Sequence, residues 1–302
     1  MITFSHRAQG ASHLKTEPPI PCQDYAGNYE NEKPEYGIAA IADGHGSAKH
    51  FRCEIGSRLA VEVALDAAKE YMKRKDGIQK IQKMSLNKSL SKEQKEKEVD
   101  GILRHLKNYI VYEWRERVKK HFEENVLSEK EIEICEKEKL DMSKEEWNIA
   151  LYGTTLLFAI LIPSNMQPGI LAFQIGDGGC VLIDENGEPR FLKELFDEVQ
   201  EGGRTNSICA SNAAENFLHI WESGKFKGIT VASDGVTDSF DRSNDSYLKF
   251  TKTLFQNFEN SPTDEVKNKL GEYLPELSKQ GSADDMSIAG IFKLEVKTEI
   301  KE

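Results

Sequence analysis

Eight residues near the N-terminus join a strand-like pattern to a polar turn: Ala39-Ala40-Ile41-Ala42-Asp43-Gly44-His45-Gly46. The small apolar run is typical of a buried strand, and the glycines allow a tight turn or close approach of a ligand. Asp43 offers hard oxygen donors, and His45 can carry a proton near neutral pH. Two interpretations are open, a functional site at a strand end or a plain Asp-Gly turn with a surface histidine.

Other acids sit beside apolar strand patterns in the same way. The stretches are Pro21-Cys22-Gln23-Asp24, Phe173-Gln174-Ile175-Gly176-Asp177-Gly178, Gly228-Ile229-Thr230-Val231-Ala232-Ser233-Asp234-Gly235 followed by Asp238, and Ser282-Ala283-Asp284-Asp285-Met286-Ser287. Taken singly, Asp177 and Asp284 are typical of turns or loops. Together with Asp43 and Asp234 they favour a shared site, because rigid strand ends can bring separate carboxylates together.

The ordered set QD, ADGHG, GTT, IGDG, ASDGVTD and ADDMS resembles the metal-dependent, type 2C serine/threonine protein phosphatases. The resemblance runs from about residue 3 to 292, with a gap in the middle. It implies a four-layer αββα sandwich, with two antiparallel sheets covered by antiparallel helices. It also implies hydrolysis of phosphoserine and phosphothreonine in proteins, by attack of a hydroxide that bridges two Mg²⁺ or Mn²⁺ ions, with a third ion as an open question. The partner would be a phosphoprotein that a serine/threonine kinase modifies.

The chemistry suits these residue types. A phosphate monoester is a dianion, so a nucleophile reaches phosphorus only when that charge is masked, and paired divalent cations do this. Mg²⁺ and Mn²⁺ prefer carboxylate, carbonyl and water oxygens. Crowded carboxylates raise one another's pKa, so such a cluster is expected to depend on cations.

Residue roles follow from the resemblance. Asp43 would bridge both ions and the Gly44 carbonyl would bind one of them, while Asp234 and Asp284 would hold the other. Asp24 would act through bound water, and Asp177 would help to form a third, weaker site. Gln23 stands where the family often has a glutamate, in the outer shell. His45 would protonate the leaving alkoxide, and Gly153-Thr154-Thr155 is expected to serve strand packing.

One departure concerns the substrate phosphate. Many members carry an arginine shortly before the first acidic pair, and here the position in register is Pro19. His13, Lys15 or Arg7 could take its place, and each could equally be an ordinary surface residue. A catalytically inactive docking module with the same fold therefore stays an alternative, as does a phosphatase of small phosphoesters.

Composition narrows the class of protein. The 302 residues carry a formal net charge of −11, which argues against nucleic-acid binding. Five widely spaced cysteines without a CxxC pair favour a reducing compartment over disulfides or a zinc ribbon. The first residues lack the apolar core of a signal peptide, and the longest apolar run, 156–162, is too short to span a bilayer. A cytoplasmic protein without membrane or nucleic-acid partners is expected.

Periodicity predicts an α+β order of elements, with strands and helices in alternating clusters. Strands are expected at 2–9, 24–29, 36–42, 152–161, 169–174, 180–184, 217–221, 228–232 and 288–294, with a hairpin loop at 28–34 and a tight turn at Asn186-Gly187. Helices are expected at 56–75, 99–122, 246–258 and 262–279, the last capped by Ser261. Capping-box spacing predicts short helices after Ser128 and Ser143.

The chain is expected to form one catalytic domain, 1–294, followed by a charged tail, 295–302. Within it, about 76–148 is a charged helical insertion. Its first part, 76–98, is lysine- and glutamate-rich and is interpreted as a mobile or marginally helical linker. The charge run 129–139 is interpreted as a solvated helix face rather than a surface for a partner.

Overall fold

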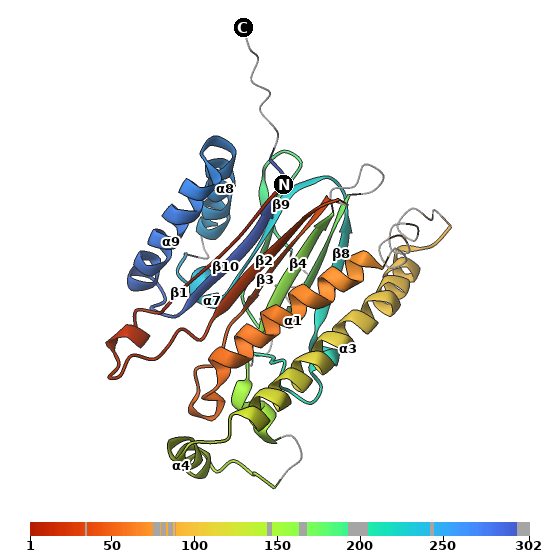
Figure 1. Ribbon diagram of the computed structural model, residues 1–302. Helices are drawn as coiled ribbons and strands as arrows, with labels where there is room; N and C mark the ends of the chain where they lie inside the picture. Colours follow the sequence, from red (N-terminus) through yellow and green to blue (C-terminus); the bar gives the residue numbers. More distant parts are fainter. Residues whose placement is uncertain are drawn as a thin grey trace.

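Two antiparallel sheets form the centre of the computed structural model (Figure 1), which describes residues 1–33, 35–74, 79, 83, 87, 89–143, 147–162, 168–192, 205–241 and 245–294. In this part of the chain each sheet has five strands. One sheet has the order β1 (Ile2–Ala8), β10 (Met286–Phe292), β9 (Phe226–Ala232), β6 (Gly179–Asp184) and β7 (Pro189–Phe191). The other has the order β2 (Tyr25–Glu32), β3 (Glu35–Ala42), β4 (Leu156–Ile162), β5 (Gly169–Ile175) and β8 (Leu218–Ser223).

The strand β4 shows why its sequence is apolar without alternation. Leu157, Ala159 and Leu161 belong to the core between the two sheets. The intervening residues, Leu156, Phe158 and Ile160, belong to the core between the second sheet and its helices. Because successive side chains point to opposite faces, a strand that is covered on both sides must be apolar throughout.

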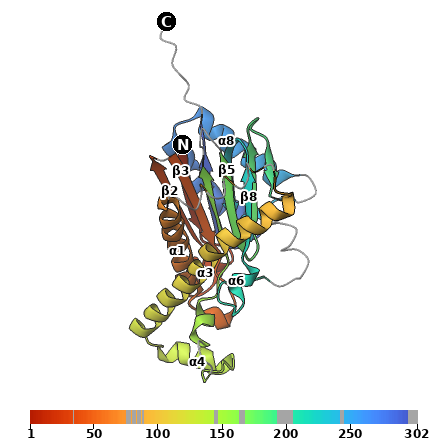
Figure 2. The ribbon, with the colours of Figure 1, turned by 90° about the vertical axis from the view of Figure 1, so that its right-hand side faces the viewer.

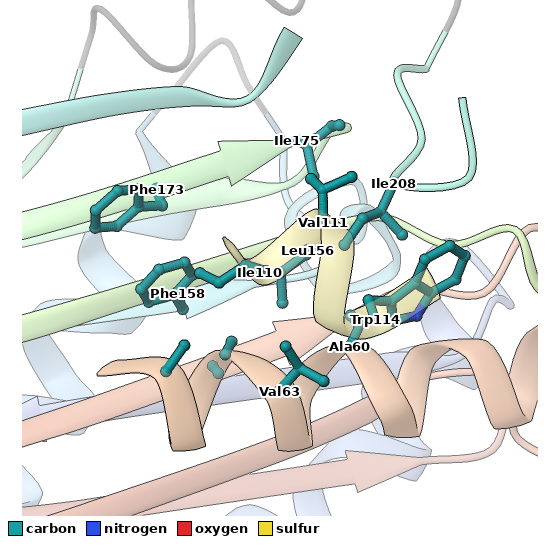
Figure 3. Close-up of a cluster of buried hydrophobic side chains, with 14 of the residues drawn as sticks. Ala60, Val63, Ile110, Val111, Trp114, Leu156, Phe158, Phe173, Ile175 and Ile208 are labelled. Carbon is teal, nitrogen blue, oxygen red and sulfur yellow. The ribbon is translucent and has the colours of Figure 1, made fainter. Parts of the chain in front are cut away.

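Helices cover the outer face of each sheet (Figures 1 and 2). The helices α1 (Cys53–Lys73) and α3 (Lys92–Glu124) lie on the sheet that contains β3, and α8 (Ser246–Asn260) and α9 (Thr263–Gln280) lie on the other. Figure 3 shows Ile110 and Trp114 of α3 and Ala60 and Val63 of α1 in one cluster with Phe158 of β4 and Phe173 of β5. The result is the four-layer α+β sandwich that the resemblance implied.

Short elements connect these layers. They are the 3₁₀ turns η1 (His13–Lys15), η2 (Ala48–His50) and η3 (Trp147–Tyr152), and the helices α4 (Glu129–Lys137), α6 (Ala213–Asn216) and α7 (Asp234–Thr237). In Figure 1, α4 lies at the lower end of the sandwich, where it contacts η2.

Several predicted boundaries are wrong. The hairpin loop at 28–34 is much shorter, because β2 continues to Glu32 and pairs there with Glu35. Asn28 is tolerated inside this strand because its amide bonds Ser5 Oγ and Thr3 Oγ1 of β1, each at 2.7 Å. The strand predicted from Tyr152 begins only at Leu156, since the residues before Gly153 form η3.

Three helix starts also differ from the prediction, and the helix expected from 56, α1, begins at Cys53. Residues 92–98 are not linker but the first turns of α3, since Ser91 and Gln94 form a capping box that the charged composition obscured. The first cap of α9 is Pro262 and not Ser261. The rest of the expected linker at 76–98 falls mostly outside the described residues, as do the tail 295–302 and Glu146, the partner expected for Ser143.

In the described part of the chain, no helix is both long and apolar enough to cross a membrane.

Candidate active site

A cleft of about 170 Å³ opens at the end of the sandwich where β3 ends and β2 begins, which is the lower end in Figure 1. Four of the predicted carboxylates line it together, although they come from distant parts of the sequence. The lining residues are His13, Gln23, Asp43, Gly44, His45, Gly46, Thr155, Asp177, Thr205, Asp234, Asp284 and Asp285.

The backbone of Asp43 is held on both sides by two threonines. Its N–H donates to Thr155 Oγ1 at 3.0 Å, and its carbonyl accepts from Thr154 Oγ1 at 2.7 Å and from the Thr155 N–H at 2.8 Å. The next residues continue the contact, because the His45 N–H donates to the Gly153 carbonyl at 3.1 Å. The role of Gly153-Thr154-Thr155 is therefore wider than strand packing, since the motif fixes the turn that carries Asp43.

Asp24 lies just before β2 and is only 1% exposed. Ser233 and Ser287 lie near its carboxylate, but neither oxygen has a hydrogen bond of good geometry among the described residues. Burial raises the pKa of Asp24 to about 7. Burial also raises the pKa of Asp43, and the neighbouring carboxyls of Asp24 and Asp234 raise it further. The carboxyls of Asp24, Asp43 and Asp234 are thus close enough for the charge of one to change the pKa of another.

Asp234 is the first residue of α7, immediately after β9. Its Oδ1 is buried without a partner in the described part of the chain, and burial raises the pKa of this carboxyl too. Asp177 follows β5 between Gly176 and Gly178, whose φ angles of +102° and +110° suit only glycine. Its Oδ2 accepts a 2.6 Å bond from the hydroxyl of Thr205.

The sequence did not single out Asp285, whose carboxylate contacts three separate residues at the wall of the cleft. Its Oδ1 accepts from the Gly10 N–H at 2.5 Å, and its Oδ2 accepts from the Gln23 N–H at 2.6 Å. His13 Nδ1 lies 3.1 Å from the same Oδ1. The pair Asp284-Asp285 was visible in the sequence, but the side chain of Asp285 is set apart by contacts with residues more than 250 positions away.

The carbonyl of Asp285 also brings two motifs together. A Cβ built on Gly235 would lie 1.9 Å from the Asp285 carbonyl oxygen, so only glycine permits this approach. The glycine after Asp234 therefore lets the ASDG turn pack directly on the ADD turn.

His45 lines the cleft beside a second histidine. The ring centroids of His45 and His50 are 5.1 Å apart, and His50 Nδ1 bonds the Ala150 carbonyl. Burial lowers the pKa of His45 to about 4, with smaller contributions from His50 and Lys49. The imidazole is therefore neutral at neutral pH in the unliganded protein.

Of the three candidates for gripping the substrate phosphate, the structure brings one into the cleft. His13 lines it, whereas Lys15 is exposed outside it. Arg7 does not line it either, because its guanidinium donates to the Asp24 carbonyl at 2.9 Å and lies 4.7 Å from the centre of the Tyr25 ring.

The donor set fits a hard divalent cation. Unpaired carboxylate oxygens are costly to bury, and those of Asp24 and Asp234 would be satisfied by an ion or by its bound water. Over the described residues, however, no group of three or more histidine, cysteine, aspartate or glutamate side chains is arranged as a ready-made metal site. The acids share one cleft without closing a coordination sphere.

Comparisons with solved structures find the same fold. A bacterial serine phosphatase is similar with a TM-score of 0.53 at 14% identity, covering 98% of this chain and 99% of the other. The serine/threonine phosphatase Stp1 from Staphylococcus aureus gives 0.51 at 12%, covering 97% and 95%, and that of S. agalactiae gives 0.50 at 15%, covering 97% and 99%. At these identities the likeness shows the fold alone. No curated protein matches the sequence.

A family model described as "Protein phosphatase 2C" matches residues 9–275, a span that includes every acid of the cleft except Asp284 and Asp285. The match covers well over half of the chain, and the chain therefore belongs to the protein phosphatase 2C family.

Proposed function

We propose that this protein hydrolyses phosphoserine and phosphothreonine in phosphoproteins with the help of Mg²⁺ or Mn²⁺. The observation that carries the proposal is the gathering of Asp43, Asp234 and Asp284 in one cleft, with Asp24 buried near Asp43. Family membership supports it, since the neighbouring folds are phosphatases of serine or threonine.

The carboxylates would hold two ions. Asp43 would contact both of them and the Gly44 carbonyl would bind one, while Asp234 and Asp284 would hold the other. Divalent cations, when bound, mask the charge of the phosphate dianion and lower the pKa of water. Asp177 would contribute to a third site, and Asp24 and Gln23 would orient water around the ions.

The other cleft residues would position the substrate and move a proton. His13 is placed to contact the phosphate, because it lines the cleft and its Nδ1 lies 3.1 Å from Asp285 Oδ1. His45 would donate a proton to the leaving serine oxygen, which is a poor leaving group without one. A bound dianion next to the ring favours the protonated imidazole that this step needs.

Hydrolysis of two substrates by three variants tests the proposal. The wild-type protein should hydrolyse a phosphoserine peptide with Mn²⁺ and lose this activity in a chelator. Asp43→Asn should abolish hydrolysis of the peptide and of nitrophenyl phosphate alike. His45→Gln should slow the peptide by about 10²–10⁴-fold but affect nitrophenyl phosphate much less, because nitrophenolate leaves without a proton. Asp264→Asn, an exposed acid on α9, is the control that should retain both activities.

Four results would contradict the proposal. Hydrolysis that persists in the chelator would exclude the cation role. Equal losses on both substrates in His45→Gln would exclude a proton-donor role for this residue. If no substrate were hydrolysed with any added cation, the protein would be better explained as an inactive docking module. If only small phosphoesters were hydrolysed, it would be better explained as a phosphatase of small phosphoesters.

A further inference from the structure

A buried arginine joins α4 to the region just behind the cleft. Arg52 precedes α1, and its side chain is 9% exposed. Its guanidinium forms a two-point contact with Glu131 of α4, from Nε to Oε1 at 2.7 Å and from Nη2 to Oε2 at 3.1 Å. Planar two-point recognition of a carboxylate is specific to arginine, and lysine does not reproduce it.

The same guanidinium reaches the elements on both sides of α4. Its Nη1 donates to the Asn125 carbonyl at the end of α3 at 2.8 Å and to the Tyr152 hydroxyl of η3 at 2.9 Å. The Tyr152 hydroxyl in turn lies 2.9 Å from Nδ1 of His121. A charged group in such a buried place is stable only while its partners remain, so these contacts form or break together.

Tyr152 leads directly into the residues that hold the catalytic turn. The backbone of Arg52 donates to the Leu151 carbonyl at 2.9 Å. Four positions later, Gly56 packs so closely on η3 that an added Cβ would lie 1.9 Å from the Tyr152 carbonyl oxygen. Beyond Tyr152, Gly153-Thr154-Thr155 binds the backbone of Asp43 and His45. An unbroken series of contacts thus runs from α4 to the cleft.

We propose that Glu131, acting through Arg52, is a positioning residue for Asp43 and His45, so that α4 is part of the apparatus that orders the active site. This extends the expectation that 129–139 is merely a solvated helix face, which still holds for its exposed residues. The activity readout of the inference rests on the proposed function, whereas the exchange readout described next does not.

Amide hydrogen exchange measured by mass spectrometry tests the connection directly. Glu131→Gln removes the negative charge that is paired with the Arg52 guanidinium. Arg52→Lys keeps the positive charge but removes the planar guanidinium that makes the two-point contact. Both variants should increase the rate of amide exchange on the order of tenfold in peptides covering 43–45 and 153–155. The N–H groups of Asp43, His45 and Thr155 are protected there by hydrogen bonds between the two segments. Glu133→Gln, an exposed glutamate on the same helix, should leave these peptides unchanged.

Kinetics supply the second readout. Because Glu131 does not line the cleft, the same two variants should lower kcat about tenfold with little change in KM, measured well below their melting temperatures. Faster exchange confined to 126–137 with an unchanged kcat would overturn the proposal and leave Glu131 a local structural residue. Should the wild-type protein prove inactive, the exchange at 43–45 and 153–155 alone still decides the matter.

Discussion

Asp43 is held through its backbone, which leaves its carboxylate available to a ligand. The three hydrogen bonds from Thr154 and Thr155 use the Asp43 N–H and carbonyl only. Burial raises the pKa values of the neighbouring Asp24 and Asp234, and nearby carboxyls, Asp285 for the first and Asp177 for the second, raise them further. Under the proposed function, a bound cation would offset the repulsion between these acids and complete a coordination sphere that they do not close by themselves.

Thr155→Val tests whether this backbone support matters. Valine keeps the shape of threonine but removes the acceptor for the Asp43 N–H, so a buried donor is left unpaired at a cost of about 1–3 kcal/mol of unfolding free energy. We expect hydrolysis to fall by about 10²-fold, because a small displacement of a catalytic group has effects of that size. Thr155→Ser keeps the hydroxyl and should retain most activity. If the valine and serine variants were equally active, the hydrogen bond from the Asp43 N–H to Thr155 Oγ1 would have no role in positioning Asp43.

At the scale of elements, the start of α4 could be predicted from the sequence, but its ion pair with Arg52 could not. The spacing of Ser128 and Glu131 predicted the start of this helix, and the structure confirms the capping box. The second partner of Glu131 is Arg52, which lies 79 positions earlier. The capping-box spacing marks Glu131 among the glutamates of this helix, but it carries no information about an arginine 79 positions away, so the pairing could not be predicted.

The ion pair gives a pH-dependent contribution to stability. The bond from Arg52 lowers the pKa of Glu131 from its ordinary value of 4.5 to about 2. A carboxyl with a lowered pKa stabilises the fold fully above its unfolded pKa, and this contribution is lost as the pH falls from about 4.5 to about 2. The difference in unfolding free energy between wild type and Glu131→Gln should therefore be largest near pH 6 and shrink toward pH 3, as measured by urea denaturation. A difference that does not vary with pH would show that the pair contributes through packing alone.

At the scale of the whole molecule, apolar patterns predicted most of the sandwich because each strand must bury one or two faces. The predicted cores of β3, β4, β5, β6 and β9 all lie in strands, and the α+β order is confirmed. The pattern missed β7, α6 and α7, which are too short to show a period.

The residues of the site likewise include some that the sequence predicted and some that it did not. Asp43, Asp177, Asp234 and Asp284 stand in motifs at strand ends, and sequence order sufficed to predict that they share a cleft. The role of Asp285 depends on Gly10 and Gln23, and that of Thr155 on Asp43. Such long-range backbone contacts leave no periodic or compositional signal, so they required the structure.

Calorimetric titration with Mn²⁺ tests most directly whether Asp43 lies at the centre of a divalent-cation site. The wild-type protein and Asp264→Asn should bind Mn²⁺ with the same affinity. Asp43→Asn should weaken the binding of at least one ion by roughly tenfold or more, and Asp234→Asn should do nearly as much, because each removes a charged oxygen ligand. Unchanged Mn²⁺ binding in both variants would contradict the account.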